Sequence, residues 1–137
     1  MQCVSLYDEC RANSYSMRSM GFWNESLPLP TYVNAGHNAP LMFGDGTATS
    51  LPATGPPLGM LSGAAYEAGA AIVPSGGTLL LFTDGLTDSI PGNDPEGRLR
   101  GAISDHAAKT MSNLKLLIDP GCKEDDITIL LVKRTER

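Results

Sequence analysis

The sequence predicts an α+β domain, a layered β-sandwich with flanking helices. Three observations lead to this fold class. Short segments rich in β-forming residues, separated by Gly and Pro turns, occupy residues 31–82. Apolar residues then recur at helical spacing from residue 98 onward, and an apolar strand pattern returns at residues 127–132. Because the helices follow a run of strands instead of alternating with them, the order favours α+β over a βαβ repeat.

Composition limits the classes of function. The chain has 137 residues, 10 basic against 15 acidic, for a net charge of −5. This balance argues against a nucleic-acid-binding surface, which shows a basic excess or stripe. The three cysteines show no C-x-x-C spacing, no apolar run approaches the ~20 residues of a membrane span, and the N-terminus resembles no secretory signal. We therefore expect a cytoplasmic protein.

The first 30 residues have no clean periodicity. Pro28 and Pro30 forbid a helix at the end of this segment. We expect an irregular lead-in over residues 1–30 and an ordered domain over residues 31–134.

Four strand segments are predicted before the central one. Residues 31–33 and 41–43 are short runs of β-formers, and the Asp45-Gly46 turn predicts a hairpin that returns over residues 47–51. A Pro- and Gly-rich loop follows, and residues 66–73 are a plausible strand weakened by alanines.

The central strand is the apolar run at residues 79–82, which leads directly into Thr83-Asp84-Gly85. A continuous apolar run is typical of a strand buried on both faces. Asp84 then stands where the chain leaves the core, a suitable place for a metal ligand because Mg²⁺ and Mn²⁺ prefer hard oxygen donors. The alternative interpretation is that Asp84-Gly85 is only a turn.

Helical spacing follows a loop at residues 90–97. The apolar stripe of the helix consists of Leu99, Ile103, Ala107 and Met111. A second short helix is predicted over residues 114–118. His106 lies within the helical segment next to the stripe and is expected at the surface or its boundary.

Asp125 precedes the last apolar strand, as Asp84 follows the central one. If the two strands are antiparallel neighbours, the end of the first meets the start of the second, and both carboxylates lie at one rim of the sheet. Two carboxylates held close repel each other and need a cation or a shared proton. A divalent metal ion between Asp84 and Asp125 satisfies this need.

Four motifs give the chain a family resemblance. They are NAGHNAPL at residues 34–41, GPPLG at 55–59, TDGLTD at 83–88 and DDIT at 125–128. In this order and rough spacing, they resemble the stage-II-sporulation-E-like phosphatases, which belong to the metal-dependent PPM-type protein serine/threonine phosphatases. The resemblance covers residues 31 to 134. It implies a β-sandwich with a two-metal Mn²⁺ or Mg²⁺ site at one sheet edge, and hydrolysis of phosphoserine or phosphothreonine by metal-activated water.

The resemblance also implies roles for individual residues. Asp84 and Asp125 match metal-binding aspartates, and Asp126 is placed just behind the ligands. Gly85 allows the backbone to approach the site. His37 is either a proton donor near the site or, as is commoner in short polar turns, a residue that satisfies turn backbone groups. The substrate implied is a phosphorylated protein such as an anti-sigma-factor antagonist.

The N-terminal part departs from the family pattern. Further metal-binding aspartates of the family lie in G-G-D-type and V-G-D-type segments, and neither segment is present before Thr31. We therefore expect the C-terminal half of a phosphatase domain, with part of an active site. Two alternatives stay open: a non-catalytic module that binds a partner or forms a homo-oligomer through exposed sheet, and a truncated product with no independent role.

Overall fold

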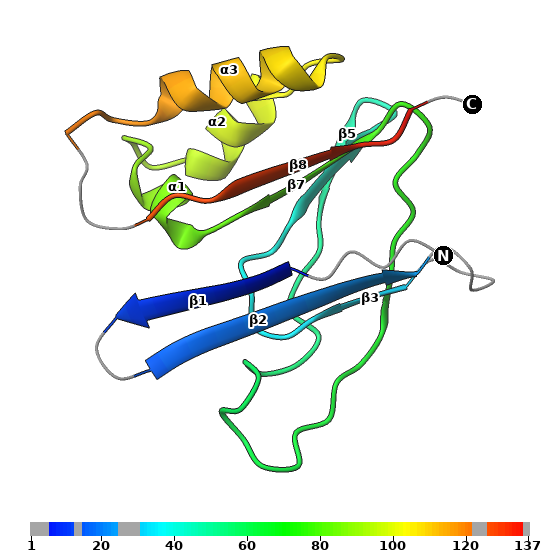
Figure 1. Cartoon of the computed structure of the whole chain (residues 1–137). Coiled ribbons are helices and arrows are strands. Elements are labelled where there is room, and N and C mark those ends of the chain that lie inside the picture. Colours follow the sequence, from blue (N-terminus) through cyan, green and yellow to red (C-terminus); the bar gives the residue numbers. More distant parts are fainter. Residues whose placement is uncertain (1–5, 13–14, 25–30, 122–125, 136–137) are drawn as a thin grey trace. The chain divides into compact units, whose positions relative to one another are not determined.

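The computed structural model describes residues 6–12, 15–24, 31–121 and 126–135. The chain forms two compact units, each assembled from two stretches of sequence. The first unit holds Met1–Ala39 and Leu51–Ile72, and the second holds Pro40–Ser50 and Val73–Arg137, in each case over the described residues. Each unit contains a four-stranded antiparallel sheet (Figure 1).

The sheet of the first unit has the strand order β1-β2-β3-β6. Its strands are β1 (Leu6–Ala12), β2 (Tyr15–Asn24), β3 (Thr31–Asn34) and β6 (Gly69–Ala70). The expectation of an irregular segment is therefore wrong for residues 6–12 and 15–24. Their mixed polarity hides the strands, which are formed by pairing with each other and with β3, over a sequence distance that local patterns do not report.

Only two of the eight residues predicted as a strand at 66–73 form one. β6 pairs with β3 through Thr31 opposite Ala70 and Tyr32 opposite Gly69. The ring of Tyr32 fills the space where a Cβ on Gly69 would lie, and burial raises the pKa of the Tyr32 phenol. Position 69 therefore requires a glycine where β6 pairs with Tyr32, and β6 does not extend into a longer strand.

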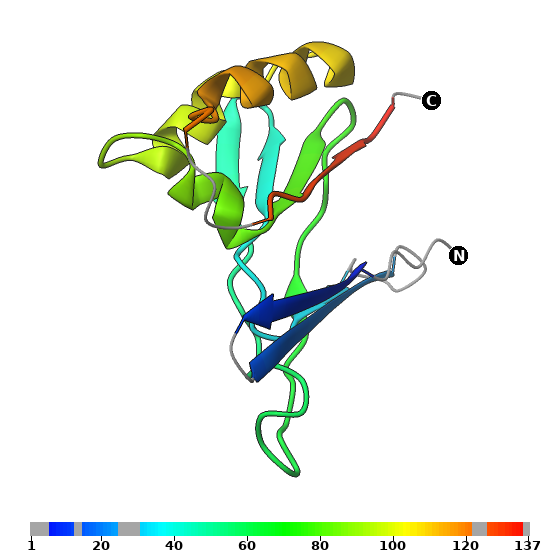
Figure 2. The ribbon, with the colours of Figure 1, turned by 60° about the vertical axis from the view of Figure 1, so that its left-hand side comes forward.

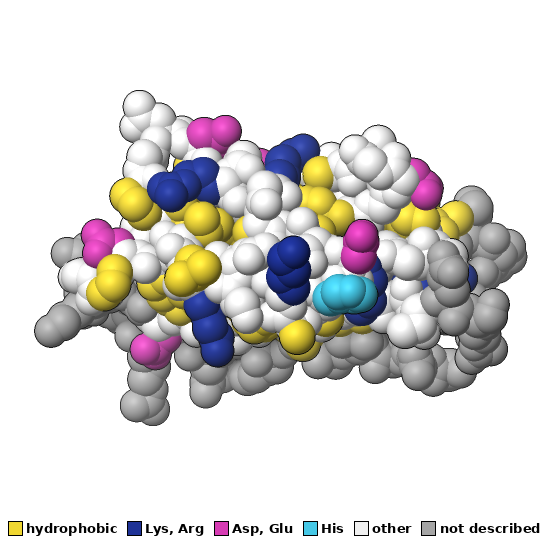
Figure 3. Space-filling model, turned by 90° about the horizontal axis from the view of Figure 1, so that it is seen from above, with side chains coloured by type: hydrophobic (Ala, Val, Ile, Leu, Met, Phe, Trp, Pro, Cys, Tyr) yellow, Lys and Arg dark blue, Asp and Glu magenta, His cyan; other side chains and the backbone are white. Residues whose placement is uncertain are grey.

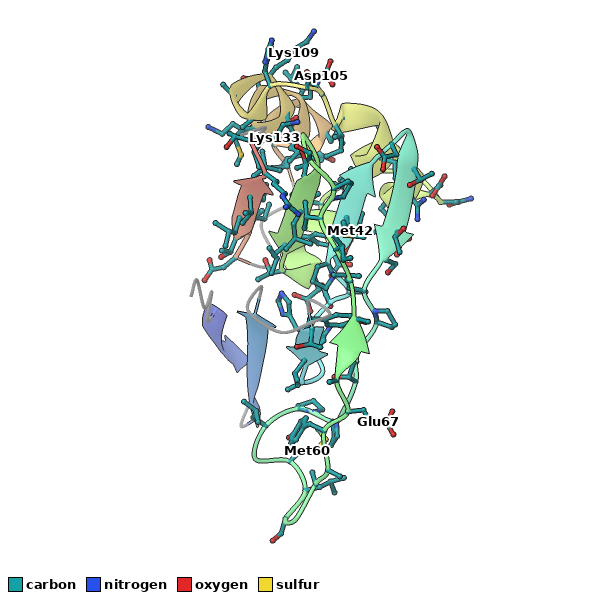
Figure 4. The ribbon with its side chains drawn as sticks, turned by 90° about the vertical axis from the view of Figure 1, so that its right-hand side faces the viewer. Met42, Met60, Glu67, Asp105, Lys109 and Lys133 are labelled. Carbon is teal, nitrogen blue, oxygen red and sulfur yellow. The ribbon has the colours of Figure 1, made fainter. Side chains whose placement is uncertain are left out.

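A closed loop lies within the second stretch of the first unit, between Leu51 and β6. Thr54 and Glu67 are joined by a backbone hydrogen bond of 3.1 Å, and the ring of Tyr66 packs against Gly55. Met60 and Glu67 both lie on this loop (Figure 4). The predicted Pro- and Gly-rich loop is confirmed.

The sheet of the second unit has the strand order β5-β4-β7-β8. Its strands are β4 (Leu41–Gly44), β5 (Thr47–Ser50), β7 (Thr78–Phe82) and β8 (Ile129–Lys133). The predicted hairpin at Asp45-Gly46 is confirmed: both residues have positive φ, 50° and 71°, as a two-residue hairpin turn requires.

Three helices pack on one face of this second sheet (Figure 2). They are α1 (Asp84–Asp88), α2 (Pro95–Ala102) and α3 (Ala107–Leu117). The core between sheet and helices consists of Leu41, Phe43, Leu80, Phe82, Leu86, Ile90, Leu99, Ala102 and Leu114. On β7, buried and half-buried residues alternate, so the prediction of a strand buried on both faces is wrong. The second face of the strand is apolar but only partly covered.

The helical region differs from the prediction of a long first helix and a short second one. The helices are separated at Ile103–His106, where His106 is extended and precedes α3. The Thr110 hydroxyl accepts from the Ser104 amide at 2.9 Å and donates to the Ser104 carbonyl at 3.2 Å, which holds the break in place. α2 also begins earlier than expected, because Asp94 caps it by accepting from the Gly97 amide at 2.8 Å.

The outer surface of the helical layer has mixed charge. Figure 3 shows lysine and arginine side chains separated by acidic and apolar ones, without a continuous basic stripe on this face. His106 is exposed, as expected. Within the described part of the chain, no helix has the length and apolarity that crossing a bilayer requires.

Candidate functional site

The C-terminal end of β7 is tied to the segment that leads into β8. Phe82 lies opposite Ile129 in the antiparallel register, and the Thr83 amide donates to the Thr128 carbonyl at 3.1 Å. β7 is apolar up to Phe82, and the chain turns polar at Thr83, so the strand leaves the core at this point. The prediction that the two strands are antiparallel neighbours is confirmed.

The Thr83 hydroxyl makes two further hydrogen bonds at this rim. It donates to the Asp126 carbonyl at 3.1 Å and accepts from the Thr128 amide at 3.0 Å. One side chain therefore fixes Asp126 and Thr128 of the DDIT segment against the TDG segment. It also explains why β8 begins at Ile129, two residues later than predicted: the Thr128 amide bonds to a side chain instead of a strand neighbour.

Asp84 opens helix α1 and is exposed. Its Oδ1 accepts from the Gly85 amide at 3.0 Å, and the Thr87 hydroxyl donates to its carbonyl at 2.8 Å. Asp84 and Gly85 begin the short helix α1, so the chain passes from the strand end directly into a helical turn. The alternative that the pair only turns the chain here stays a prediction, as the ligand role does. A carboxylate at a helix start is favoured by the amide groups directed toward it.

Gly85 is buried in the first turn of α1. It is not among the glycines with positive φ, so its freedom to adopt left-handed conformations is not used here. Its amide instead orients the Asp84 carboxylate. The close approach of its backbone to a bound group stays a prediction.

Asp126 lies at the same rim as Asp84, through its bond to the neighbouring Thr83. Its side chain is exposed. Asp125 lies outside the described residues. Among the residues that are described, no three His, Cys, Asp or Glu side chains gather into a metal-binding group.

The donors at this rim suit a hard cation. Asp84 and Asp126 offer exposed carboxylate oxygens, the ligand type that Mg²⁺ and Mn²⁺ prefer. Two such groups are fewer than the ligands of a complete site, so the described residues fit part of a metal site. The role of Asp84 and Asp125 as ligands stays a prediction.

The NAGHNAPL motif, which begins at Asn34, forms a turn in the first unit. The Asn34 side chain is buried, with 4% of its surface exposed. It accepts from the His37 amide at 2.8 Å and donates to the carbonyls of His37 and Leu51 at 3.1 and 3.3 Å. Asn34 therefore satisfies backbone groups of this turn, a role that the sequence analysis considered for His37 and did not consider for Asn34.

Gly36 and Thr54 complete this turn. Gly36 has φ +76°, and a Cβ on it would lie 2.5 Å from the Pro57 ring, so only glycine fits. The Thr54 amide donates to the Asn34 carbonyl at 2.8 Å, and a β-bridge between Ala35 and Gly55 joins the NAGH and GPPLG motifs. His37 lies in the first unit and Asp84 in the second. A role for His37 as a proton donor stays a prediction.

Comparison with known proteins identifies relatives of this chain. The family model of stage II sporulation protein E (SpoIIE) matches residues 21–135. Phosphoserine phosphatase RsbP of Bacillus subtilis (strain 168) is 33% identical over 106 residues, which cover 74% of this chain and 26% of RsbP. The chain therefore spans about a quarter of the length of this curated relative.

Two solved structures have a similar fold. The RsbU and RsbW domains of Rv1364c from Mycobacterium tuberculosis match with a TM-score of 0.67 and 25% identity, over 88% of this chain and 38% of that one. The manganese-soaked phosphatase domain of SpoIIE from Bacillus subtilis matches with a TM-score of 0.60 and 12% identity, over 87% of this chain and 57% of that one. The second likeness shows the fold alone.

Proposed function

Because the chain belongs to the stage II sporulation protein E family of PPM-type phosphatases, we propose that it serves metal-dependent hydrolysis of phosphoserine or phosphothreonine in a protein. We assign residues 31–134 to the C-terminal part of the phosphatase domain. The observation that supports this function best is the rim at Thr83, where the TDG segment is tied to the segment following Asp125.

In this proposal Asp84 and Asp125 supply metal ligands, and Asp126 and Gly85 support them. Mn²⁺ or Mg²⁺, when bound, lowers the pKa of a coordinated water and offsets charge on the phosphoryl oxygens. Among the described residues, no three His, Cys, Asp or Glu side chains gather into a metal-binding group. In the proposal, this chain supplies part of an active site.

Other residues at the rim have positioning roles. Thr83 fixes the spacing between the two acidic segments through its hydroxyl. Gly85 and Thr87 hold Asp84 at the start of α1. Of these contacts, the hydrogen bond from the Gly85 amide reaches the carboxylate itself and favours one orientation of it, which reduces the ordering required when a cation binds.

The proposed substrate is a phosphorylated regulatory protein, such as an anti-sigma-factor antagonist. Two relatives support this choice: RsbP is a phosphoserine phosphatase, and an RsbU domain occurs with an RsbW domain in Rv1364c. A cytoplasmic location accords with such a substrate. Both points are proposals for the whole protein, of which this chain is one part.

The test is Mn²⁺-dependent hydrolysis of p-nitrophenyl phosphate by the 137-residue chain, together with Mn²⁺ binding by calorimetry. We expect Mn²⁺ binding that Asp84→Asn abolishes; turnover by this part of the site, where it occurs, requires Mn²⁺ and is abolished by the same substitution. Asp45→Asn is the matched control, since Asp45 is an exposed aspartate of the β4–β5 turn and has no role in the proposed metal site. A chain that neither binds Mn²⁺ nor turns over the substrate would contradict the proposal.

A further inference from the structure

Helix α1, which begins with Asp84, is too short to be stable by itself. It has five residues, fewer than an isolated helix needs in water, so its position depends on contacts at its two ends. Thr83 fixes the start of the helix through the Asp126 carbonyl and the Thr128 amide. Ser89 follows the last helical residue and is only 2% exposed, so the end of the helix is buried.

All polar groups of Ser89 form hydrogen bonds. Its amide donates to the Gly85 carbonyl at 3.1 Å, and its hydroxyl donates to the Leu86 carbonyl at 2.8 Å. Its carbonyl accepts from the Asp119 amide at 2.9 Å. The first two bonds close the last turn of α1, and the third joins this turn to the segment that follows α3.

Asp119 shapes the chain directly after this contact. The residue is exposed, and Ile118 before it packs against the core of the second unit. The Asp119 Oδ1 accepts from the Gly121 amide at 2.8 Å. An aspartate that bonds to the amide two residues later forms an Asx turn, which fixes the direction of the chain locally. The chain therefore leaves α3 through a turn whose first residue is tied to α1.

The two contacts of α1 flank both proposed metal ligands in the sequence. Thr83 and Ser89 lie on either side of Asp84, and their partners at positions 119 and 126 lie on either side of Asp125. A segment that is held at both ends loses less conformational freedom on binding than a segment held at one end. The contact at Ser89 therefore lowers the entropy cost of bringing the two acidic segments to one cation.

We propose that the Ser89–Asp119 junction, which consists of Ser89, Asp119 and Gly121, is a second positioning element of the metal site. Within it, Asp119 is a positioning residue that acts through its hydrogen bond to the Gly121 amide, without touching the cation and not through its charge. The inference rests on the proposed function, because it assigns this role at the same metal site.

Calorimetry of Mn²⁺ binding, at a temperature where each variant is folded, separates the hydrogen bond from the charge. Asp119→Ala removes the acceptor of the Gly121 amide, whereas Asp119→Asn keeps an oxygen acceptor and removes only the charge. We expect alanine to raise the dissociation constant for Mn²⁺ on the order of fivefold, the cost of ordering about one more backbone residue. Asparagine should restore the wild-type value.

Asp105→Ala is the control for this series. Asp105 is exposed in the break between α2 and α3, so its substitution removes the same charge away from the junction (Figure 4). It should leave the Mn²⁺ affinity unchanged. Equal weakening by alanine and asparagine at position 119 would show that the charge of Asp119 matters, and would overturn the proposal.

Hydrogen exchange of the metal-free chain separates this inference from the proposed function. The Thr128 amide bonds to the Thr83 hydroxyl and so reports how firmly the acidic segment is held. We expect Asp119→Ala, and not Asp119→Asn, to speed exchange of this amide about fivefold, because the lost constraint is the same. If this change occurs in a chain that binds no Mn²⁺, the metal site is contradicted and the junction is supported as an anchor. An unchanged Thr128 amide would overturn the junction, whether or not Mn²⁺ binds.

Ser89→Ala tests the junction from the side of α1. It removes the buried bond to the Leu86 carbonyl but keeps the carbonyl that accepts from Asp119. We expect exchange of the Asp119 amide to become about tenfold faster, because a hydrogen bond that holds its acceptor is lost. Ser112→Ala is the matched control, since the Ser112 hydroxyl donates to the Ala108 carbonyl at 3.0 Å on the exposed side of α3. Equal exchange of the Asp119 amide in both variants would overturn the role of Ser89 in the junction.

Discussion

At the scale of single residues, two polar side chains organise the motifs. Thr83 joins the ends of two strands through one hydroxyl, and Asn34 closes a turn through one buried amide. Neither residue is acidic, and neither is distinguished by periodicity. Both act by satisfying backbone groups that the local chain leaves unpaired, a need that is not visible before the fold is known.

Thr83→Val tests the first of these roles. Valine keeps the shape of threonine but removes the hydrogen bonds to the Asp126 carbonyl and the Thr128 amide. We expect a loss of about 1 kcal/mol in the free energy of unfolding, measured with urea, since the bonds are exposed to water. Thr83→Ser is the control and should retain most of the stability. Equal stability of the two variants would contradict the bridging role.

Asn34→Asp tests the second role. The carboxylate can still accept from the His37 amide, but it cannot donate to the carbonyls of His37 and Leu51. Because the site is buried, we expect a loss of about 1–3 kcal/mol in the free energy of unfolding at neutral pH. Thermal unfolding against the wild type measures it. An unchanged melting temperature would show that the turn does not require the amide.

At the scale of elements, the sequence predicts the strands that have β-forming residues and clear turns. The β4–β5 hairpin follows from Asp45-Gly46, and β7 from its apolar run. The helical break is not predictable from the apolar stripe, because Leu99, Ile103, Ala107 and Met111 continue the period across it. It depends on Thr110, which bonds back to Ser104 and replaces a turn of helix.

The strands β1 and β2 were missed for a related reason. Their polarity does not alternate strictly, and they are defined by long-range pairing with each other and with β3. At the candidate site, the adjacency of the two acidic segments was predictable from two apolar strands of opposite direction. The hydroxyl bridge at Thr83 was not, because it depends on the register.

The start of α2 offers an element-scale prediction. Asp94 accepts from the Gly97 amide and precedes Pro95, a favourable first residue of a helix. Asp94→Ala should lower the free energy of unfolding by about 1 kcal/mol, whereas Asp94→Asn should lower it less. Chemical denaturation of the three proteins measures the difference. If alanine and asparagine were equivalent, the cap would not contribute.

At the scale of the whole molecule, the metal site proposed at the Thr83 rim determines how a cation affects stability. The chain spans part of the length of its relatives, and among the described residues no three His, Cys, Asp or Glu side chains gather into a metal-binding group. Binding of a cation at the rim would stabilise the folded state, because the unfolded chain does not hold the two acidic segments together.

Mn²⁺ should therefore raise the melting temperature of the chain. At a free concentration 100 times the dissociation constant, linkage gives about 2.7 kcal/mol of added stability. Differential scanning fluorimetry with and without millimolar Mn²⁺ measures the shift, and Asp84→Asn should abolish it while Asp45→Asn retains it. A melting curve that Mn²⁺ leaves unchanged would argue against a shared site.

The most direct measurement of the central claim is paramagnetic broadening of backbone amide signals by Mn²⁺ in NMR spectra. We predict that signals from both sides of the rim, those of Gly85 and of Asp126–Thr128, broaden together at low Mn²⁺ and recover in the Asp84→Asn and Asp125→Asn variants. Broadening on only one side, or broadening that persists in both variants, would contradict a cation held between the two acidic segments.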